Sequence, residues 1–275
     1  YTTVAKRFGG APSHKKGKRL CFFFFLLPPM KRDDITVHGY PWRVRAELGV
    51  TVFGRNARYR FLIFDLDETL YSPETGLMKI IGQRISQYME QRMGLPVSQV
   101  EHLRREYYAR YGTTMRGLIV HYHIDPEDYL SYVHDIPLDK YLAPDPKLRE
   151  VLRAIPLEKV IFTNSTAEHA RQVLRHLRIE DLFTRIVDVR AVDYMSKPAP
   201  RAYQRLLDIL GTRGEACIFA DDGVHNLCPA KELGMTTVLV NDNQPDDADC
   251  CVDFTIARAV EIARVLKVLG LGIWQ

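Results

Sequence analysis

The chain has 275 residues, of which 46% are hydrophobic and 26% charged, a balance that is ordinary for a globular protein. Its net charge of +4 comes from residues 1–57, which carry 11 Lys/Arg against 3 Asp/Glu, whereas the rest of the chain is acidic overall. This distribution argues against a nucleic-acid partner for the folded part, and no apolar run approaches the roughly 20 residues of a membrane span.

The first segment, residues 1–57, shows no sustained periodicity. A basic cluster precedes the short apolar run 21–27, which is the order of an export signal. That run is at the lower limit of length, and no small-residue cleavage site follows it. We therefore expect residues 1–57 to be a poorly ordered basic leader outside the fold.

Four apolar runs of strand length follow in the remaining chain. They lie at 59–66, 159–163, 216–220 and 236–240. Amphipathic helical patterns separate the later runs, and this alternation predicts an α/β fold with a parallel sheet that is covered on both faces.

Two of the helical patterns carry clear start or stop signals. Ser165 and Glu168 form a capping-box pattern that opens a helix through residue 178, with Ser165 as the expected N-cap. Pro200 precedes a second helix that Gly211 ends.

Residues 72–142 differ, because they are helical in pattern and contain no strand candidate. Ser98 and Glu101 suggest a capping box, and Asp125 followed by a proline predicts the start of a short helix. We therefore predict an all-helical cap at 73–142, inserted into an α/β core made of 58–72 and 143–275.

The first strand ends in two carboxylates, Asp65 and Asp67, followed by Glu68 and Thr69. Ligands of open α/β sheets bind at the carboxyl ends of the strands. One carboxylate there can attack a substrate while the other handles protons. A plain acidic turn is the alternative, and a calcium loop fits less well because the required glycine is missing.

The later strand ends carry matching polar groups. Thr163 and Asn164 offer a hydroxyl and an amide that suit phosphate oxygens. Lys197 lies between two strand–helix units, where a phosphate or carboxylate partner is plausible. Asp221 and Asp222 end the third strand, so four carboxylates meet at one edge, and hard oxygen ligands of this kind predict Mg²⁺.

Taken together, these motifs resemble the haloacid dehalogenase superfamily, and more closely its pyrimidine 5′-nucleotidase-like branch. The stretches that carry the resemblance lie between residues 58 and 245 and are FDLDETLY (64–71), YYARYGTTMRGL (107–118), FTNSTAEHARQVLRHL (162–177), VDYMSKPAPRAY (192–203), FADDGVHNL (219–227) and AKELGMTTVLV (230–240).

The resemblance implies a Rossmann-like core with a helical cap inserted after the first motif. It implies Asp65 as nucleophile and metal ligand, and Asp67 as general acid and base with its main-chain carbonyl on the metal. Thr163 and Lys197 would hold the phosphoryl group, and the pair Asp221 and Asp222 would complete the metal shell.

Two positions differ from common patterns of the superfamily. Gly223 stands where the branch usually has a serine. Asn226 stands where many superfamily members have a second acid, although the branch favours asparagine. Neither change removes an indispensable group.

The predicted cap contains candidate residues for substrate specificity. Tyr107, Tyr108 and Tyr111 could stack on a nucleobase, although at least one is expected to pack in the cap core. Tyr108 and Arg116 are our candidate specificity residues. His225, beside the last motif, is expected to be an ordinary loop histidine, with a ligand contact as the alternative.

The predicted activity is Mg²⁺-dependent hydrolysis of a phosphomonoester through an aspartyl-phosphate, with nucleoside 5′-monophosphates as first substrates. A sugar-phosphate phosphatase or phosphomutase on the same scaffold is one alternative, and a non-enzymatic binding protein on a retired phosphatase fold is another. A dehalogenase is disfavoured because its chemistry needs no acid at Asp67.

The five cysteines bear on the compartment. They are odd in number, and Cys250 and Cys251 are adjacent, so they do not predict a disulfide framework. Cys217 lies in an apolar run and is expected to be buried. This pattern favours a reducing compartment, and we predict a cytoplasmic location.

Overall fold

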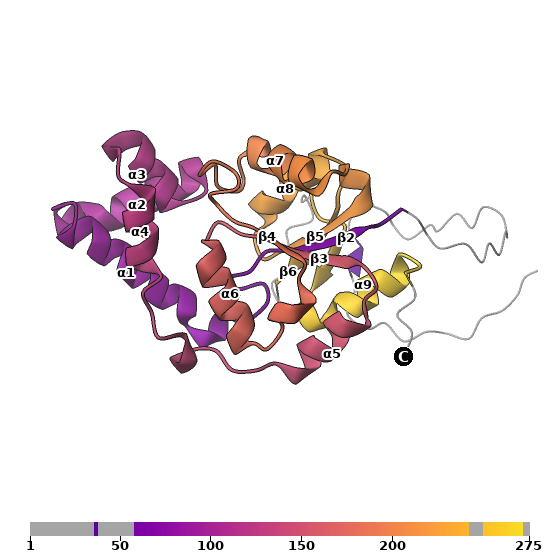
Figure 1. The fold of residues 1–275 in the computed structure, drawn as a ribbon. Helices are drawn as coiled ribbons and strands as arrows, with labels where there is room; N and C mark the ends of the chain where they lie inside the picture. Colours follow the sequence, from indigo (N-terminus) through magenta and orange to yellow (C-terminus); the bar gives the residue numbers. More distant parts are fainter. Residues whose placement is uncertain (1–35, 38–57, 242–249, 272–275) are drawn as a thin grey trace, which may run out of the picture. The chain divides into compact units, whose positions relative to one another are not determined.

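The computed structural model describes residues 36–37, 58–241 and 250–271 (Figure 1). The predictions for 1–35 and 38–57, including the apolar run 21–27, lie outside these described residues. The described chain forms one seven-stranded sheet in the order β1-β7-β6-β5-β2-β3-β4. Its strands are β1 (Thr36–Val37), β2 (Phe61–Phe64), β3 (Glu158–Phe162), β4 (Arg185–Val187), β5 (Cys217–Asp221), β6 (Thr236–Val240) and β7 (Phe254–Ile256).

The six strands from β2 to β7 run parallel, which confirms the predicted fold class. The edge strand β1 differs, because Thr36 and Val37 pair antiparallel with β7. Two residues of the segment that we expected to lie outside the fold therefore extend the sheet. The strands β1, β4 and β7 were missed because two or three residues are too few to show a period in the sequence.

Both faces of the sheet are covered, as alternating side chains of β2 show. Leu62 and Phe64 are fully buried in one cluster with side chains of helices α5, α6 and α9, whereas Phe61 and Ile63 join a second cluster with α7 and α8. The two helical layers are visible in Figure 1. These helices are α5 (Pro146–Ala154), α6 (Ala167–His176), α7 (Pro200–Leu210), α8 (Val224–Glu232) and α9 (Ile262–Val268).

The helix starts agree with the sequence in part. Helix α7 begins at Pro200 and ends at Gly211, whose φ of 59° is the left-handed conformation that glycine adopts without strain. Helix α6 begins one residue later than expected, because the hydroxyl of Thr166 accepts the N-cap hydrogen bond from His169. Ser165 is therefore free for a different contact.

The helical insertion between β2 and β3 forms its own small core (Figure 1). Asp125 caps its last helix as predicted, whereas Ser98 lies inside a helix that already begins at Val97. The four α-helices are α1 (Leu77–Gln91), α2 (Val97–Tyr111), α3 (Thr114–Tyr122) and α4 (Pro126–Val133). Among the described residues, no helix is both long and apolar enough to cross a bilayer.

The turn at the end of α2 packs closely against the core. Gly112 ends α2 with a φ of 79°, and a Cβ atom built there would lie 2.3 Å from the main-chain oxygen of Lys197. Thr113 adds a hydrogen bond from its hydroxyl to Ser196 (3.1 Å). The glycine is required both for the turn and for this close approach, so the insertion is held against the loop that carries Lys197.

The cysteines differ from the prediction. Cys228 of α8 and Cys251 form a disulfide, which links α8 covalently to the segment that leads into β7. Sequence alone could not select this pair, because connectivity follows from the fold. Cys217 is buried as expected, and burial raises the pKa of its thiol to about 12. The cytoplasmic location stays a prediction.

Candidate active site

The first catalytic candidate, Asp65, lies at the carboxyl end of β2. Its main-chain N–H donates to Ala220 of β5, which continues the strand pairing and fixes the backbone at this point. The carboxylate accepts hydrogen bonds from Lys197 Nζ (2.6 Å) and Thr69 Oγ1 (3.1 Å). Burial raises its pKa to about 7, with Asp221 adding to the effect and Lys197 opposing it.

Lys197 is buried between two carboxylates. Its ammonium donates to Asp65 at 2.6 Å and to Asp221 at 2.7 Å. Burial disfavours its charge, but the two carboxylates outweigh burial and raise the pKa of Lys197 above its ordinary value. The lysine is therefore a fixed cation beside the nucleophile candidate, and its contact with a phosphoryl group stays a prediction.

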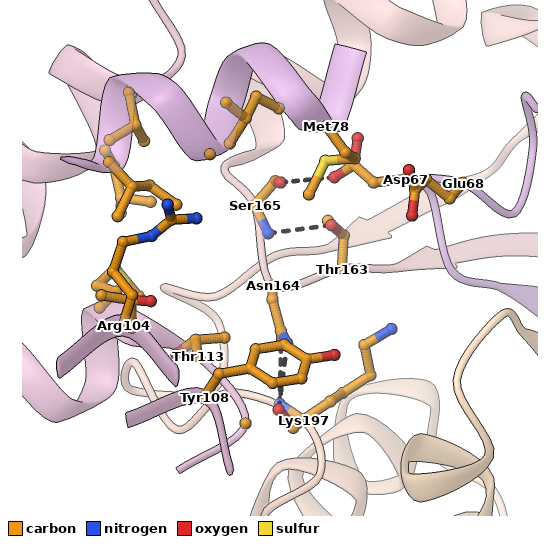
Figure 2. A pocket seen from close by; sticks show the side chains of 18 of the residues that line it. Asp67, Glu68, Met78, Arg104, Tyr108, Thr113, Thr163, Asn164, Ser165 and Lys197 are labelled. Carbon is orange, nitrogen blue, oxygen red and sulfur yellow. Dashed lines mark hydrogen bonds between the residues drawn. The ribbon is translucent and has the colours of Figure 1, made fainter. Parts of the chain in front are cut away.

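Asn164 holds the main chain of Lys197. Its Oδ1 accepts from the Lys197 N–H (2.7 Å), and its Nδ2 donates to the Lys197 carbonyl (3.2 Å), as Figure 2 shows. We predicted this amide as a phosphate ligand. In the structure its amide uses one donor and one acceptor to position the loop of Lys197. Asn164 also lines the cavity, and its contact with a phosphate stays a prediction.

Asp67, the acid–base candidate, has its own set of hydrogen-bond donors, different from those of Asp65. Ser165 Oγ donates to it at 2.8 Å (Figure 2). Tyr71 OH donates to it at 2.7 Å, and His169 Nε2 lies 3.5 Å away. Burial tends to raise the pKa of Asp67, but interactions with His169, Tyr71 and Ser165 prevail and lower it well below its ordinary range. These contacts favour the ionised form of the carboxylate.

Ser165 and His169 are site residues that sequence reasoning missed. Ser165 was predicted as an N-cap, and its hydroxyl turns instead to Asp67. His169 is fully buried and stacks on His134 from the end of α4, with ring centres 4.2 Å apart. No local pattern links a histidine of α6 to a carboxylate after β2, because only folding brings the two elements together.

The last motif places Asp221 and Asp222 beside the same site. Asp221 Oδ1 accepts from the Gly223 N–H and from Asn226 Nδ2, and its other oxygen accepts from Lys197. Burial and the neighbouring carboxylates Asp221 and Asp65 raise the pKa of Asp222 to about 8. One lysine thus faces several carboxylates, which leaves an excess of negative charge.

This excess of negative charge raises the question of whether the site can bind a metal ion. In the described part of the chain, no three His, Cys, Asp or Glu side chains converge as a ready-made metal site. Asn226 Oδ1, however, is buried and accepts no hydrogen bond from a described residue. Hard oxygens and uncompensated carboxylates are the donor set that suits Mg²⁺, so the residues fit this ion.

Gly223 also has a structural consequence. A Cβ atom at this position would lie 2.8 Å from the His225 ring, so a serine there would require the ring to move. His225 packs edge-on against Tyr108, with ring centres 5.8 Å apart. The glycine thus leaves space for a contact between the last motif and the cap.

These groups open onto a cavity of about 460 Å³ between the core and the helical insertion. Asp65 lines it from the core. So do Asp67 and Thr163, while Tyr108, which is 55% exposed, lines it from α2 (Figure 2). Tyr107 is buried in the cap core, as expected for at least one of the tyrosines.

The second predicted cap residue, Arg116, does not line this cavity. It lies in the first turn of α3, where its main-chain N–H donates to the Thr113 hydroxyl of the N-cap. Arg104 and Arg105 of α2 line the cavity instead. The helical spacing could not distinguish these arginines, because the orientation of α2 and α3 toward the core is set by tertiary packing.

Comparison with known proteins agrees with this fold. The family model of haloacid dehalogenase-like hydrolases matches residues 59–234, so the chain belongs to this family. Phosphate metabolism protein 8 of Saccharomyces cerevisiae is 32% identical over 196 residues, which are 66% of this chain and 61% of that protein. A phosphatase of Mycobacterium tuberculosis is 29% identical over 114 residues, 42% of this chain and 50% of its own length.

The chain thus spans less than two thirds of the length of these two relatives. Among solved structures, the HAD phosphatase from Thermococcus onnurineus has a TM-score of 0.52 and 20% identity, over 78% of this chain and all of that chain. The 2-haloacid dehalogenase from Pseudomonas syringae pv. Tomato has a TM-score of 0.51 and 17% identity, over 77% and 99%. At this identity the two structures support the fold alone.

Proposed function

We propose that the chain is a Mg²⁺-dependent phosphomonoester hydrolase that acts through an aspartyl-phosphate on Asp65, with nucleoside 5′-monophosphates as substrates. The observation that carries this proposal is the pair Asp65 and Asp67 at the carboxyl end of β2, open to a cavity beneath a helical cap. The yeast and mycobacterial relatives, named for phosphate metabolism and as a phosphatase, support phosphate chemistry. Tyr108 on the cavity wall supports a substrate with an aromatic ring.

In the first half-reaction, an Asp65 oxygen forms a bond to phosphorus while the bond from phosphorus to the leaving oxygen breaks. The leaving oxygen takes a proton from Asp67. Because the contacts of Asp67 favour its ionised form, it must gain a proton in the substrate complex before this step.

In the second half-reaction, Asp67 accepts a proton from water, and the resulting hydroxide attacks the phosphorus of the aspartyl-phosphate. The bond from phosphorus to Asp65 breaks, which releases inorganic phosphate and restores the carboxylate. One positioned carboxylate can serve both steps because it is protonated before the first and ionised before the second. Lys197 and Thr163 would contact the phosphoryl oxygens.

The metal would be held by the Asp65 and Asp222 carboxylates and the main-chain carbonyl of Asp67. When bound, Mg²⁺ would neutralise charge on the phosphoryl group and allow an anionic carboxylate to approach it. Asp221 was predicted as a fourth ligand. Because its oxygens accept from Lys197, Gly223 and Asn226, we assign it the positioning of these groups.

A substrate panel tests the proposal. The purified chain is assayed with Mg²⁺ for phosphate release from nucleoside 5′-monophosphates, ribose 5-phosphate, hexose phosphates and an aryl phosphate. We expect the highest kcat/KM for a nucleoside monophosphate. A preference for sugar phosphates would contradict the nucleotide assignment, and absence of turnover on every ester, including the aryl phosphate, would favour a retired phosphatase fold.

The metal prediction is tested by chelation. We expect EDTA to abolish phosphate release and Mg²⁺ to restore it, while excess Ca²⁺ inhibits. Calcium prefers six to eight ligands at longer distances, so it would engage both Asp65 oxygens and block attack. Circular dichroism of the chelated protein should be unchanged. Full activity in EDTA would show that no divalent ion takes part.

A further inference from the structure

The cap contributes apolar side chains to the cavity wall. Ile81 and Ile85 of α1 and Leu130 and Val133 of α4 line the cavity. Arg104 of α2 also lines it, on the opposite side from Asp67 and Lys197 (Figure 2). A cation in an apolar wall has no role in the phosphoryl chemistry described above, because it is on the far side from those groups.

The guanidinium of Arg104 is held through one nitrogen, Nη1. Nη1 donates to Ser86 Oγ at 2.9 Å and lies 3.4 Å from Glu101 Oε2. Nε is buried and donates to no described residue. The side chain keeps 26% of its surface exposed. One edge of the planar group is therefore anchored, while the donor next to the side-chain stem is unused.

Gly82 makes room for this arrangement. A Cβ atom at this position of α1 would lie 3.0 Å from Arg104 Nη2, a tight contact that would require the guanidinium to shift slightly. Glycine is also costly inside a helix. Gly82 therefore leaves space for the guanidinium, although glycine lowers the intrinsic stability of α1.

The charges at the two ends of the cavity differ in sign. At the catalytic end the carboxylates of Asp65, Asp67 and Asp222 outnumber Lys197, whereas at the cap end Arg104 and Arg105 outnumber Glu101. A substrate that spans the cavity would bring its phosphate to the metal end, an apolar or flat body to the middle, and a hydrogen-bond acceptor to the cap end.

We propose that Arg104 is the specificity-determining residue of the cap and that it donates to a carbonyl oxygen of the leaving group. This inference rests on the proposed function. It names the substrate class as phosphomonoesters whose leaving group carries a carbonyl oxygen remote from the phosphate. Among nucleotides, uridine 5′-monophosphate has this feature, and ribose 5-phosphate, which shares the phosphate and sugar but has no base, lacks it.

The test compares Arg104→Met with the wild type on these two esters. A charged hydrogen bond to a ligand corresponds to about a ten- to hundred-fold change. We expect KM for uridine monophosphate to rise by about that factor with kcat nearly unchanged. The kcat/KM for ribose 5-phosphate should stay within about twofold, because that ester has no group for the arginine to contact.

Two further variants separate hydrogen bonding from charge and from cap stability. Arg104→Lys keeps the charge but loses the Nε donor and the planar fork, so we expect it not to restore KM. Gly82→Ala removes no polar group and favours the helix, but it shifts the guanidinium of Arg104, so we expect a smaller rise in KM for uridine monophosphate alone. Arg110→Met, on the exposed side of α2, is the matched control and should leave both esters unaffected.

The outcomes are distinct. If the wild type hydrolyses uridine monophosphate and Arg104→Met loses activity equally on both esters, Arg104 supports the cap fold and the inference is wrong while the proposed function stands. Full rescue by lysine would also overturn it, in favour of a simple charge effect. If the wild type hydrolyses ribose 5-phosphate but not the nucleotide, both the nucleotide assignment and the role of Arg104 fail.

Discussion

Asp65→Asn is expected to abolish phosphate release, with a loss of at least about 10⁴-fold in kcat. An amide is not a nucleophile toward phosphorus, yet it has nearly the same shape as the carboxylate. It can still accept the hydrogen bond from Lys197, so the fold should remain. The measurements are steady-state phosphate release and intact mass spectrometry of acid-quenched protein, in which the wild type should carry a phosphoryl group and the variant none.

The control for this variant is Asp208→Asn, which changes an exposed carboxylate on α7 and should retain full activity. A melting temperature near that of the wild type would exclude unfolding as the cause of a loss. Near wild-type turnover by Asp65→Asn, or a phosphoryl group that remains on the variant, would show that another residue attacks.

Asp67→Asn is expected to slow turnover by about 10²–10⁴-fold, the usual contribution of a positioned acid or base. The loss should be larger for an alkyl phosphate such as a nucleotide than for an aryl phosphate, because an aryl oxide leaves readily without a proton. With the aryl ester, the aspartyl-phosphate should accumulate, since its hydrolysis still needs a base. Rapid-quench kinetics would separate the two half-reactions.

The matched variant is Tyr71→Phe, which removes one of the hydrogen bonds to Asp67 and leaves the carboxylate in place. We expect its loss to be much smaller than that of Asp67→Asn. Equal losses of Asp67→Asn on alkyl and aryl phosphates, without accumulation of the phosphorylated chain, would indicate that Asp67 holds the site together and does not transfer protons.

The sequence by itself predicted the α/β class, the insertion of helices after the first strand and the strand-end positions of the motifs. These features follow from local rules. Strand-length apolar runs, such as the one that ends at Asp65, define buried parallel strands, and the carboxyl ends of such strands share one edge. Asp65, Lys197 and Asp221 could therefore be expected together, and the structure joins them through the Lys197 ammonium.

Only the tertiary structure decided which side chains meet when they belong to elements far apart in the chain. The contacts of Asp67 with Ser165 and His169 depend on how α6 packs against β2. Whether Arg104 or Arg116 lines the cavity depends on how α2 and α3 face the core. Helical and strand periodicity describe which residues share a face of one element. They carry no information on the direction in which that face points, because direction is set by packing between elements.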